Sequence, residues 1–462
     1  MKPLPVGISD FAKLRRKECF YVDKTRLISD FFRTGSFFTL FTRPRRFGKS
    51  LNLSMFRYFL EIGADPALFQ GLQIMEDLEI VEKHMGRYPV IHLSFKDVTG
   101  ESFDAARNAL ATAFGEEASR FFFLLESPFL SSYDIQDYKK LIRRAEDVSG
   151  APFYDISDEV LMGGIRVLSK LLHKHYGAPC VVLLDEYDVP LDRAYTFGYD
   201  HQMLPLIRGM ISGGLKDNEH VDYGMVVGCL RTKKDSIFTG INLSVNTVLN
   251  VRMSEHFGFT KAEVQSILKE YDLVGNQDAF RQKYEGYYYG KKYIYNPWDV
   301  LCAANSLANG GEKTLESFWA DSGSNDILKQ MLNFAHSSLC RGKIQALLDG
   351  KTIRFAVNEK LTYPQLCENL SNLWTTMLMA GFLTPVGEIW QETGEIEAGI
   401  PNGELQDLFE KQVVIWGTQE ALKDEKILAR FCSAAEKEDA VLMEEILGGV
   451  LKIGRASCRE RV

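Results

Sequence analysis

Long apolar runs are absent from this 462-residue sequence. No stretch approaches the roughly 20 apolar residues that a membrane-spanning helix needs, so we expect no membrane partner. The opening residues, MKPLPVGISDFAKLRRK, also lack the apolar centre of a secretory signal. The eight cysteines are scattered and contain no CxxC pair, which argues against a zinc site or a disulfide framework. We therefore expect a cytoplasmic protein with reduced thiols.

An excess of positive charge is lacking as well. The formal net charge of −8 argues against a surface that binds nucleic acid broadly, so any contact with DNA would need a local patch. We find no internal repeat. Apolar residues make up 45% of the chain, and its length has room for two or three domains of about 150 residues each. These values predict a globular protein of several domains, and they leave a monomer or an oligomer open.

Five short apolar runs predict buried strands. They cover residues 37–42, 90–95, 181–186, 224–229 and 246–251. Nearly continuous apolar runs separated by helical patterns are typical of parallel strands covered on both faces. We predict an α/β three-layer sandwich with a mostly parallel five-stranded sheet. The long gap between the second and third runs carries two amphipathic patterns, and it is predicted to hold helices plus an inserted segment rather than another sheet.

The segment RPRRFGKS, Arg43 to Ser50, lies between an apolar run and a helical pattern. This is the order of a phosphate-binding loop, in which helix N–H groups face phosphates, a lysine reaches the terminal ones and a serine hydroxyl ligates Mg2+. The candidate nucleotide-binding residues are Arg45, Arg46, Phe47, Gly48, Lys49, Ser50 and Leu51. Arg43 occupies the position of the first glycine of the common motif, and Pro44 fixes the neighbouring φ, so the loop must follow another backbone route. The alternative is a chance tripeptide in a basic turn.

The run VVLLDE ends in two adjacent carboxylates, Asp185 and Glu186. We predict that Asp185 and Ser50 hold Mg2+, and that Glu186 takes a proton from an attacking water. Capping of the following loop is the alternative, but two carboxylates after so apolar a strand are costly without a counter-ion. Since carboxyl ends of parallel strands meet at one edge, Lys49 and Asp185 should converge there. Asp188 is interpreted as an exposed loop charge.

Arg231 follows the fourth run at the same edge. It is a candidate for stabilising transition-state charge, or for a salt bridge to a nearby carboxylate. Lys233 and Lys234 complete a small basic cluster that could touch phosphates of ATP or DNA.

The buried strands are expected to stop at about residue 257. Beyond it, Thr260 and Glu263 form a predicted capping box, and Pro297 is predicted to open a helix. The aromatic stretch 284–295 is interpreted as a small packed hairpin, with base stacking as the alternative. From about residue 340, two helices, a two-stranded wing and a third helix suit a winged-helix-like module, although a generic helical appendage is equally compatible.

Several blocks resemble the AAA-ATPase-like proteins of bacteria and archaea that often carry a C-terminal PD-(D/E)xK nuclease domain. The blocks cover residues 4–15, 21–28, 42–51, 183–191, 236–243, 257–264 and 295–301. The resemblance implies a P-loop NTPase fold that uses ATP and Mg2+. It matches Lys49 and Ser50 with the loop residues, Asp185 with the metal aspartate and Glu186 with the catalytic glutamate. Tyr21, Asp23 and Lys24, in the block at 21–28, are expected either to line the base or ribose or to form a plain strand-to-helix turn.

Two features depart from that family. The sequence VVGCLR places Gly228 where a threonine commonly senses the γ-phosphate, so this role falls to Arg231 or Thr232, or is absent. No Glu-x-Lys follows residue 300, so the nuclease core is not visible and we do not expect this chain to cut DNA.

These patterns predict three domains. Residues 1–256 would be the P-loop domain, 257–340 a helical lid, and 341–452 the winged-helix-like module leading to a missing nuclease domain. Residues 453–462, IGRASCRERV, look like a translated sequencing adapter on a truncated chain, with a genuine basic tail as the alternative.

We expect an ATPase that regulates an attached nuclease or a DNA-associated effector. DNA would bind the winged-helix-like module or the missing domain. The alternative is a nucleotide-binding switch or scaffold that turns over negligibly and controls a partner.

Overall fold

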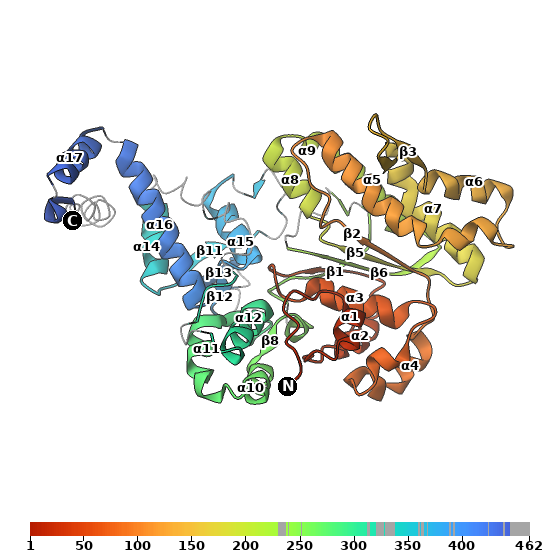
Figure 1. The fold of residues 1–462 in the computed structure, drawn as a ribbon, viewed down its shortest axis with the longest axis horizontal. Helices are drawn as coiled ribbons and strands as arrows, with labels where there is room; N and C mark the ends of the chain where they lie inside the picture. Colours follow the sequence, from red (N-terminus) through yellow and green to blue (C-terminus); the bar gives the residue numbers. More distant parts are fainter. Residues whose placement is uncertain are drawn as a thin grey trace.

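Five parallel strands form the central sheet, in the order β2–β5–β6–β1–β7 (Figure 1). They are β1 (Phe38–Thr42), β2 (Val90–Ser94), β5 (Cys180–Asp185), β6 (Val221–Gly228) and β7 (Ser244–Asn246). The computed structural model describes residues 1–229, 237–238, 240–250, 252–311, 315–319, 328, 338–358, 361, 365–366, 368–387, 390, 393–423, 425–437 and 439–443. The predicted parallel sheet of five strands is confirmed. Arg231, Thr232, Lys233, Lys234 and residues 453–462 lie outside the described residues.

Helices cover both faces of this sheet (Figure 1). One layer holds α1 (Phe11–Arg16), α2 (Arg26–Arg33), α3 (Lys49–Leu60) and α4 (Leu78–His84). The other holds α5 (Phe103–Ser119), α7 (Asp158–Tyr176), α8 (Val189–Phe197) and α9 (Asp200–Leu215). Side chains of β5 alternate between them, since Val181 and Leu183 pack with the first layer while Val182 and Leu184 pack with the second. Burial on both faces explains the continuous apolar runs.

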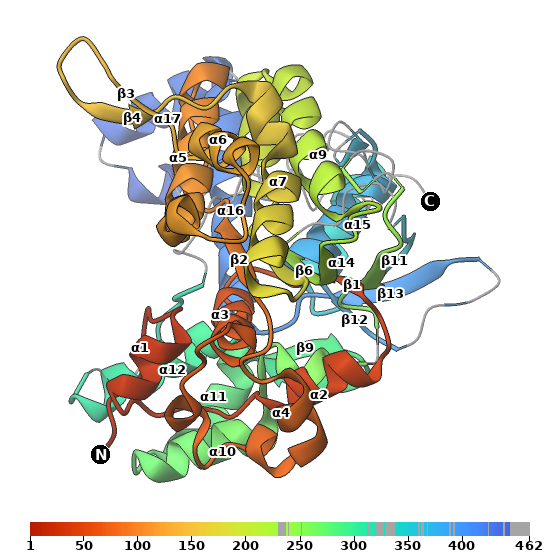
Figure 2. The same cartoon turned by 90° about the vertical axis from the view of Figure 1, so that its right-hand side faces the viewer.

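The segment between β2 and β5 differs in part from the prediction. Its helices α5 and α7 form where expected, with α6 (Ser132–Leu141) between them. However, β3 (Arg144–Glu146) and β4 (Pro152–Tyr154) make an antiparallel hairpin that stands out from the body (Figure 2), so the expectation of no further sheet is wrong. Asp147 closes its turn by accepting the N–H groups of Ser149 and Ala151. Strands this short carry too little periodicity to reveal themselves in the sequence.

The fifth strand also differs from its prediction. It was expected at 246–251 but covers Ser244–Asn246. The Oδ1 of Asn250 accepts the N–H of Thr247 at 2.7 Å, which turns the chain directly after the strand.

The strands of the central sheet end before residue 257, as expected, and the later strands form two small antiparallel sheets. The first contains β8 (Phe259–Thr260), β9 (Glu285–Tyr289) and β10 (Lys292–Tyr295), flanked by α10 (Lys261–Glu270), α11 (Gln277–Tyr284) and α12 (Pro297–Ala308). Thr260 and Glu263 form the predicted capping box, and Pro297 opens α12 as predicted. Tyr287 and Tyr289 are buried, which confirms the packed hairpin.

The second small sheet joins β11 (Ile353–Ala356), β13 (Glu395–Gly399) and β12 (Thr384–Pro385). It lies among α14 (Ser338–Leu348), α15 (Leu370–Ala380) and α16 (Gly403–Lys423), and α17 (Glu425–Glu436) follows. The predicted wing had two strands. The third, β11, was not foreseen, although its alternating burial is typical of a strand with one covered face.

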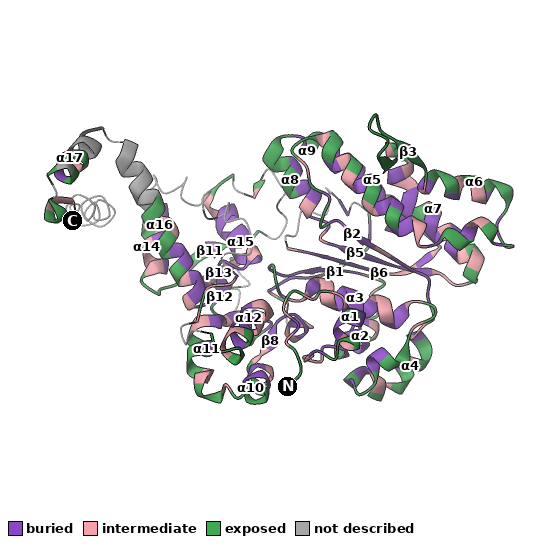
Figure 3. Cartoon of the chain, in the orientation of Figure 1, coloured by how far each residue is buried: buried purple, intermediate pink, exposed green. Residues whose placement is uncertain are grey.

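Buried residues follow the central sheet and the inner sides of its helices (Figure 3). Among the described helices, none combines the length and apolar character that a bilayer span requires.

Candidate nucleotide-phosphate site

The loop of residues 43–48 joins β1 to α3. Gly48 is the N-cap of α3 and has a φ of +79°, a left-handed conformation that glycine adopts without steric cost. The first backbone hydrogen bond of the helix runs from the N–H of Asn52 to the carbonyl of Gly48. The N–H groups of the three residues between them therefore have no partner within the helix, and the helix dipole adds partial positive charge. This end of α3 suits an anionic group.

Lys49 is the first residue of α3, and it is largely buried. Its Nζ donates hydrogen bonds to the carbonyl oxygens of Arg43 and Pro44, both at 2.9 Å. The same Nζ lies 3.3 Å from Sγ of Cys229, the residue that follows β6. The ammonium is thus held where the ends of β1 and β6 meet.

Ser50 and Asp185 come together from the first turn of α3 and the last residue of β5. The Ser50 side chain lies close enough to the Asp185 carboxyl group to affect its pKa, and the Asp185 Oδ1 is buried and has no hydrogen-bond partner. Burial raises the pKa of Asp185 to about 6; the Ser50 hydroxyl and the Lys49 ammonium oppose this rise, while the Glu186 carboxyl adds to it. A buried carboxylate oxygen without a partner, beside a serine hydroxyl, fits a divalent cation that also binds phosphate oxygens.

The acidic edge continues beyond β5. Glu186 is half-buried and has a φ of +52°, a conformation that costs a non-glycine residue about 1–3 kcal/mol and often occurs at functional sites. Asp188 is buried, and its Oδ2 accepts the N–H of Cys229 at 2.8 Å, so its interpretation as an exposed loop charge is wrong. Burial alone would lower the pKa of Arg45, but Cys229 and the neighbouring carboxyl groups raise it. Arg45 itself is exposed, and its charge interacts with the charges of this edge.

Arg43 serves a different purpose from the glycine that it replaces. Its fully buried guanidinium donates to the Thr42 carbonyl at 2.8 Å and to the carbonyl and Oδ1 of Asn246 in β7 at 3.0 and 2.6 Å. It lies 5.1 Å from the ring of Phe257. Burial lowers its pKa to about 10, which leaves it charged at neutral pH. The residue thus fastens β1 to β7, and its carbonyl holds Lys49.

Gly228 is needed for packing at the end of β6. A Cβ at this position would lie 2.6 Å from the Tyr187 ring and 2.7 Å from Oδ1 of Asp188. Among the described residues at this strand end, Cys229 contacts the Lys49 ammonium, a role that its place in an apolar run did not indicate. Arg231 and Thr232, the expected replacements for a sensing threonine, lie outside the described residues.

Comparison with known proteins decides the family. The model of a family described as "Predicted AAA-ATPase" matches residues 5–238, just over half of the chain. The chain belongs to this family. The family supports a P-loop ATPase, and the mixed α/β fold with its parallel sheet is consistent with that assignment.

Two further proteins are similar to this AAA-ATPase family member. An uncharacterized protein in the vnfD 5' region of Azotobacter chroococcum mcd 1 is 29% identical over 352 residues, which are 72% of this chain. The chain spans 56% of that relative's length. The Walker-type ATPase PABY2304 of Pyrococcus abyssi superposes with a TM-score of 0.44 and 11% identity, over 86% of this chain and 97% of the other.

Two other loop residues of the AAA-ATPase family member, Arg46 and Phe47, contact the C-terminal half. The Arg46 guanidinium lies 4.2 Å from the ring of Trp298. Phe47 is buried against Tyr287 and Tyr289, at centroid distances of 4.9 and 5.7 Å. Leu51, in the first turn of α3, is half-buried against the α1–α4 layer.

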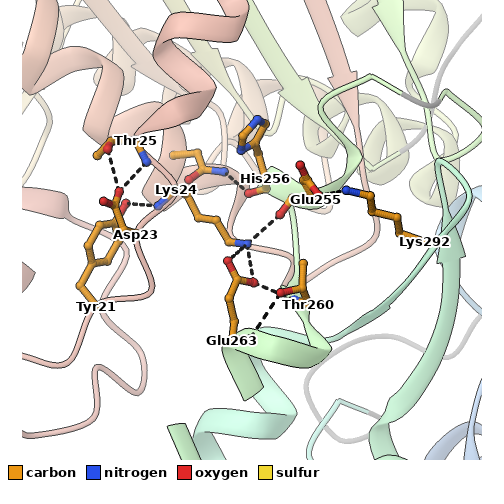
Figure 4. Close-up of polar contacts among 10 residues, drawn as sticks. Tyr21, Asp23, Lys24, Thr25, Glu255, His256, Thr260, Glu263 and Lys292 are labelled. Atoms are coloured by element: carbon orange, nitrogen blue, oxygen red, sulfur yellow. Dashed lines mark hydrogen bonds and ion pairs between the residues drawn. The ribbon is translucent and has the colours of Figure 1, made fainter. Parts of the chain in front are cut away.

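The block of the resemblance at residues 21–28 makes contacts within the protein (Figure 4). Tyr21 is half-buried and donates to Sδ of Met55 at 3.5 Å, while Asp23 accepts the N–H and hydroxyl of Thr25. The Nζ of Lys24 donates to both carboxylate oxygens of Glu263, at 2.6 and 2.7 Å. These contacts favour the plain turn over a direct role in lining the base or ribose.

Proposed function

We propose that this chain binds ATP together with Mg2+ at residues 45–51 and the acidic end of β5, and that it hydrolyses ATP there. The buried Oδ1 of Asp185, which has no hydrogen-bond partner, carries the proposal, because this carboxylate is suited to a cation and lies beside Ser50 at a helix end suited to phosphate. Among the described residues, no cluster of three or more His, Cys, Asp or Glu could hold a metal ion. Mg2+ needs no such cluster, because it is usually bound by one or two carboxylates plus phosphates.

Each residue has a role in this proposal. Lys49 exchanges the carbonyls of the loop for the β- and γ-phosphate oxygens, which form stronger charge-assisted hydrogen bonds. Ser50 and Asp185 hold Mg2+, which when bound neutralises charge on the phosphates. Glu186 accepts a proton from the attacking water, a function that typically contributes about 10²- to 10⁴-fold in rate. Arg45 adds positive charge at the same edge, and Arg231 is the proposed stabiliser of transition-state charge.

Two substitutions test the proposal. Lys49→Ala should lose affinity for ATP in a fluorescence titration, because the ammonium that pairs with the phosphates is gone. Glu186→Gln should keep ATP binding and lose steady-state phosphate release by at least about 100-fold. Glu219→Gln is the control, because this carboxyl group is 88% exposed and lies just before β6, at the opposite edge of the sheet. Full ATP binding by Lys49→Ala, or undiminished turnover by Glu186→Gln, would contradict the assignment.

One observation favours a second function. The end of β6 presents Cys229 to Lys49, and a thiol is a weak hydrogen-bond donor for a γ-phosphate. A site without a strong sensor could act as a nucleotide-binding switch or scaffold that controls a partner and turns over negligibly. Phosphate release by the wild-type chain distinguishes the two functions. Release at a measurable rate supports the ATPase, whereas tight binding without release supports the switch.

We also propose that the site regulates an effector, with DNA as the candidate partner of a winged-helix-like module at residues 341–452. Repeating the phosphate-release assay with duplex DNA tests this part. An increased rate supports it, and an unchanged rate together with no DNA binding in an anisotropy titration contradicts it.

A further inference from the structure

The phosphate loop is contacted by two tryptophans that come from the C-terminal half of the chain. Nε1 of Trp319 donates a hydrogen bond to the carbonyl of Arg45 at 3.1 Å. The neighbouring Arg46 has its guanidinium 4.2 Å from the ring of Trp298, within the range of a cation–π contact. The two tryptophans therefore hold consecutive residues of the loop, just before Gly48.

The backbone at this point of the loop is strained. Arg46 has a φ of +68°, in the left-handed region that costs a non-glycine residue about 1–3 kcal/mol. Such a conformation persists only where surrounding contacts over-determine it. The peptide group between Arg45 and Arg46 carries the carbonyl that accepts from Trp319. The indole N–H therefore helps to keep the loop in the shape that positions its lysine.

Trp319 is itself held by a buried carboxyl group. The backbone N–H of Trp319 donates to Oε1 of Glu404 at 2.7 Å, and its ring packs edge-on against Phe382 at 5.2 Å. Glu404 lies in the first turn of α16 and is 1% exposed. A chain of contacts thus runs from α16 through Trp319 to the carbonyl of Arg45.

A second buried carboxyl group explains how Glu404 can lie in this position. Asp299, in the first turn of α12, is fully buried and interacts with Glu404. Burial, and then the Glu404 carboxyl group, raises the pKa of Asp299 well above its ordinary value, although the Arg46 guanidinium opposes this. Because Asp299 keeps its proton more readily, two negative charges are not buried side by side.

We propose that Trp319 and Glu404 are positioning residues for the phosphate loop, so that ATP binding depends on α16 being docked beside it. This inference rests on the proposed function, because it assumes that residues 45–51 bind ATP. Glu404 orients Trp319, and Trp319 fixes the Arg45 carbonyl. Conversely, ATP in the loop should strengthen the docking of α16, since coupling between two sites is reciprocal.

The substitution Trp319→Phe tests the first link. Phenylalanine keeps an aromatic ring beside Phe382 but removes the N–H donor to Arg45. We expect about five-fold weaker binding of a fluorescent ATP analogue with Mg2+, equivalent to one hydrogen bond. The matched control is Trp374→Phe, since Trp374 is fully buried in α15 and its Nε1 has no hydrogen-bond partner. ATP should change the tryptophan emission of the wild type and of the control, with most of that change lost in Trp319→Phe.

The second link is tested at Glu404 by a pair of substitutions. Glu404→Gln keeps an oxygen that can accept from the Trp319 N–H, so its ATP affinity should match that of the wild type. Glu404→Leu has a similar size but no acceptor, so its affinity should fall as in Trp319→Phe. The double variant Trp319→Phe/Glu404→Leu should bind no more weakly than either single variant, because both changes interrupt the same chain of contacts.

The outcomes separate the inference from the proposed function. If Lys49→Ala abolishes ATP binding while folded Trp319→Phe binds as the wild type does, the inference is overturned and the proposed function stands. Equal losses in Glu404→Gln and Glu404→Leu also overturn it. If the wild-type chain binds no ATP, the proposed function fails and the inference fails with it.

Discussion

At the scale of single residues, Asp185 shows how burial prepares a carboxyl group for a cation. An ordinary aspartate has a pKa near 3.9, whereas burial raises that of Asp185 to about 6. A carboxyl group whose pKa is raised by folding stabilises the folded chain most below the unfolded pKa. That stability is lost as the pH rises through about 6, because the buried group must then ionise. A bound cation would remove this penalty by compensating the carboxylate charge.

We predict that Asp185→Asn stabilises the nucleotide-free chain at pH 8, by up to about 3 kcal/mol, while it weakens Mg2+-dependent ATP binding. Asparagine has nearly the same size as aspartate and cannot ionise. Thermal melts at pH 3.5, pH 5 and pH 8 measure the effect, and the advantage of the variant should fall to about half at pH 5 and nearly disappear below the unfolded pKa of about 3.9. A variant that is less stable than the wild type at pH 8 would contradict the assigned cause.

Residues within one local motif were the easiest to predict from the sequence. Lys49, Ser50 and Asp185 each follow or end an apolar run, so the strand order brings them together. The contribution of Arg43 could not be foreseen, because its partner Asn246 is 203 residues away in the sequence. The burial of Asp188 likewise depends on where β6 ends. The roles of Lys49, Ser50 and Asp185 in catalysis and binding stay predictions.

At the scale of elements, α10 is tied to the N-terminal segment by a partly buried ion pair (Figure 4). The side chain of Lys24 is 9% exposed and that of Glu263 is 25% exposed. The Lys24 Nζ also donates to the carbonyl of Glu255 at 2.7 Å, and Glu263 accepts the N–H of Thr260 at 2.7 Å as part of the capping box. One carboxylate therefore both begins a helix and anchors it.

We predict that Lys24→Met destabilises the chain by about 2–3 kcal/mol, because it leaves the Glu263 charge without its partner. This is somewhat less than for a fully buried pair, since Glu263 is partly exposed. Adding Glu263→Gln should restore part of the loss, because glutamine removes the charge and still completes a capping box. The melting temperatures of the three proteins measure this.

The control for that series is Lys140→Met. Lys140 forms an ion pair with Asp137, and both side chains are exposed. It should change stability by less than about 1 kcal/mol. A double variant that melts no higher than Lys24→Met alone would show that the unpaired charge is not the cause.

The elements that the sequence predicted well are those buried on two faces. The first four strands of the central sheet could be predicted from their apolar runs, because helical patterns separate these runs. Strands β3, β4 and β11 have only three or four residues each. Each forms because it pairs with another strand, and no sequence motif marks it. Short strands of this kind are fixed by pairing rather than by their own composition.

At the scale of the whole molecule, the two halves of the chain meet on the phosphate loop. Residues before 257 supply the loop and its acidic edge, while Phe47 packs with Tyr287, Tyr289 and Met379 in one apolar cluster. The predicted domain boundaries remain a proposal. The contacts of Phe47 join residues from all three predicted domains. Sequence patterns describe each half separately, whereas the side-chain contacts between the halves have no local signal.

We predict that ATP with Mg2+ at about 100 times its dissociation constant stabilises the chain by roughly 2.7 kcal/mol, and that this stabilisation reaches both halves. Hydrogen exchange followed by mass spectrometry should show protection in α3 and also at residues 284–289 and 400–409. Lys49→Ala under the same conditions should show neither. Protection confined to residues before 257 would mean that the halves respond independently.

Arg43 has one more consequence, for the border of the sheet. Strand β7 is three residues long and pairs only with β1 among the described strands. The guanidinium that fastens it belongs to the same residue whose carbonyl holds the lysine of the loop. A displacement of Arg43 would therefore weaken the attachment of β7 to β1 and also remove a hydrogen-bond acceptor of Lys49. The position of β7 and the position of Lys49 are thus coupled through one residue.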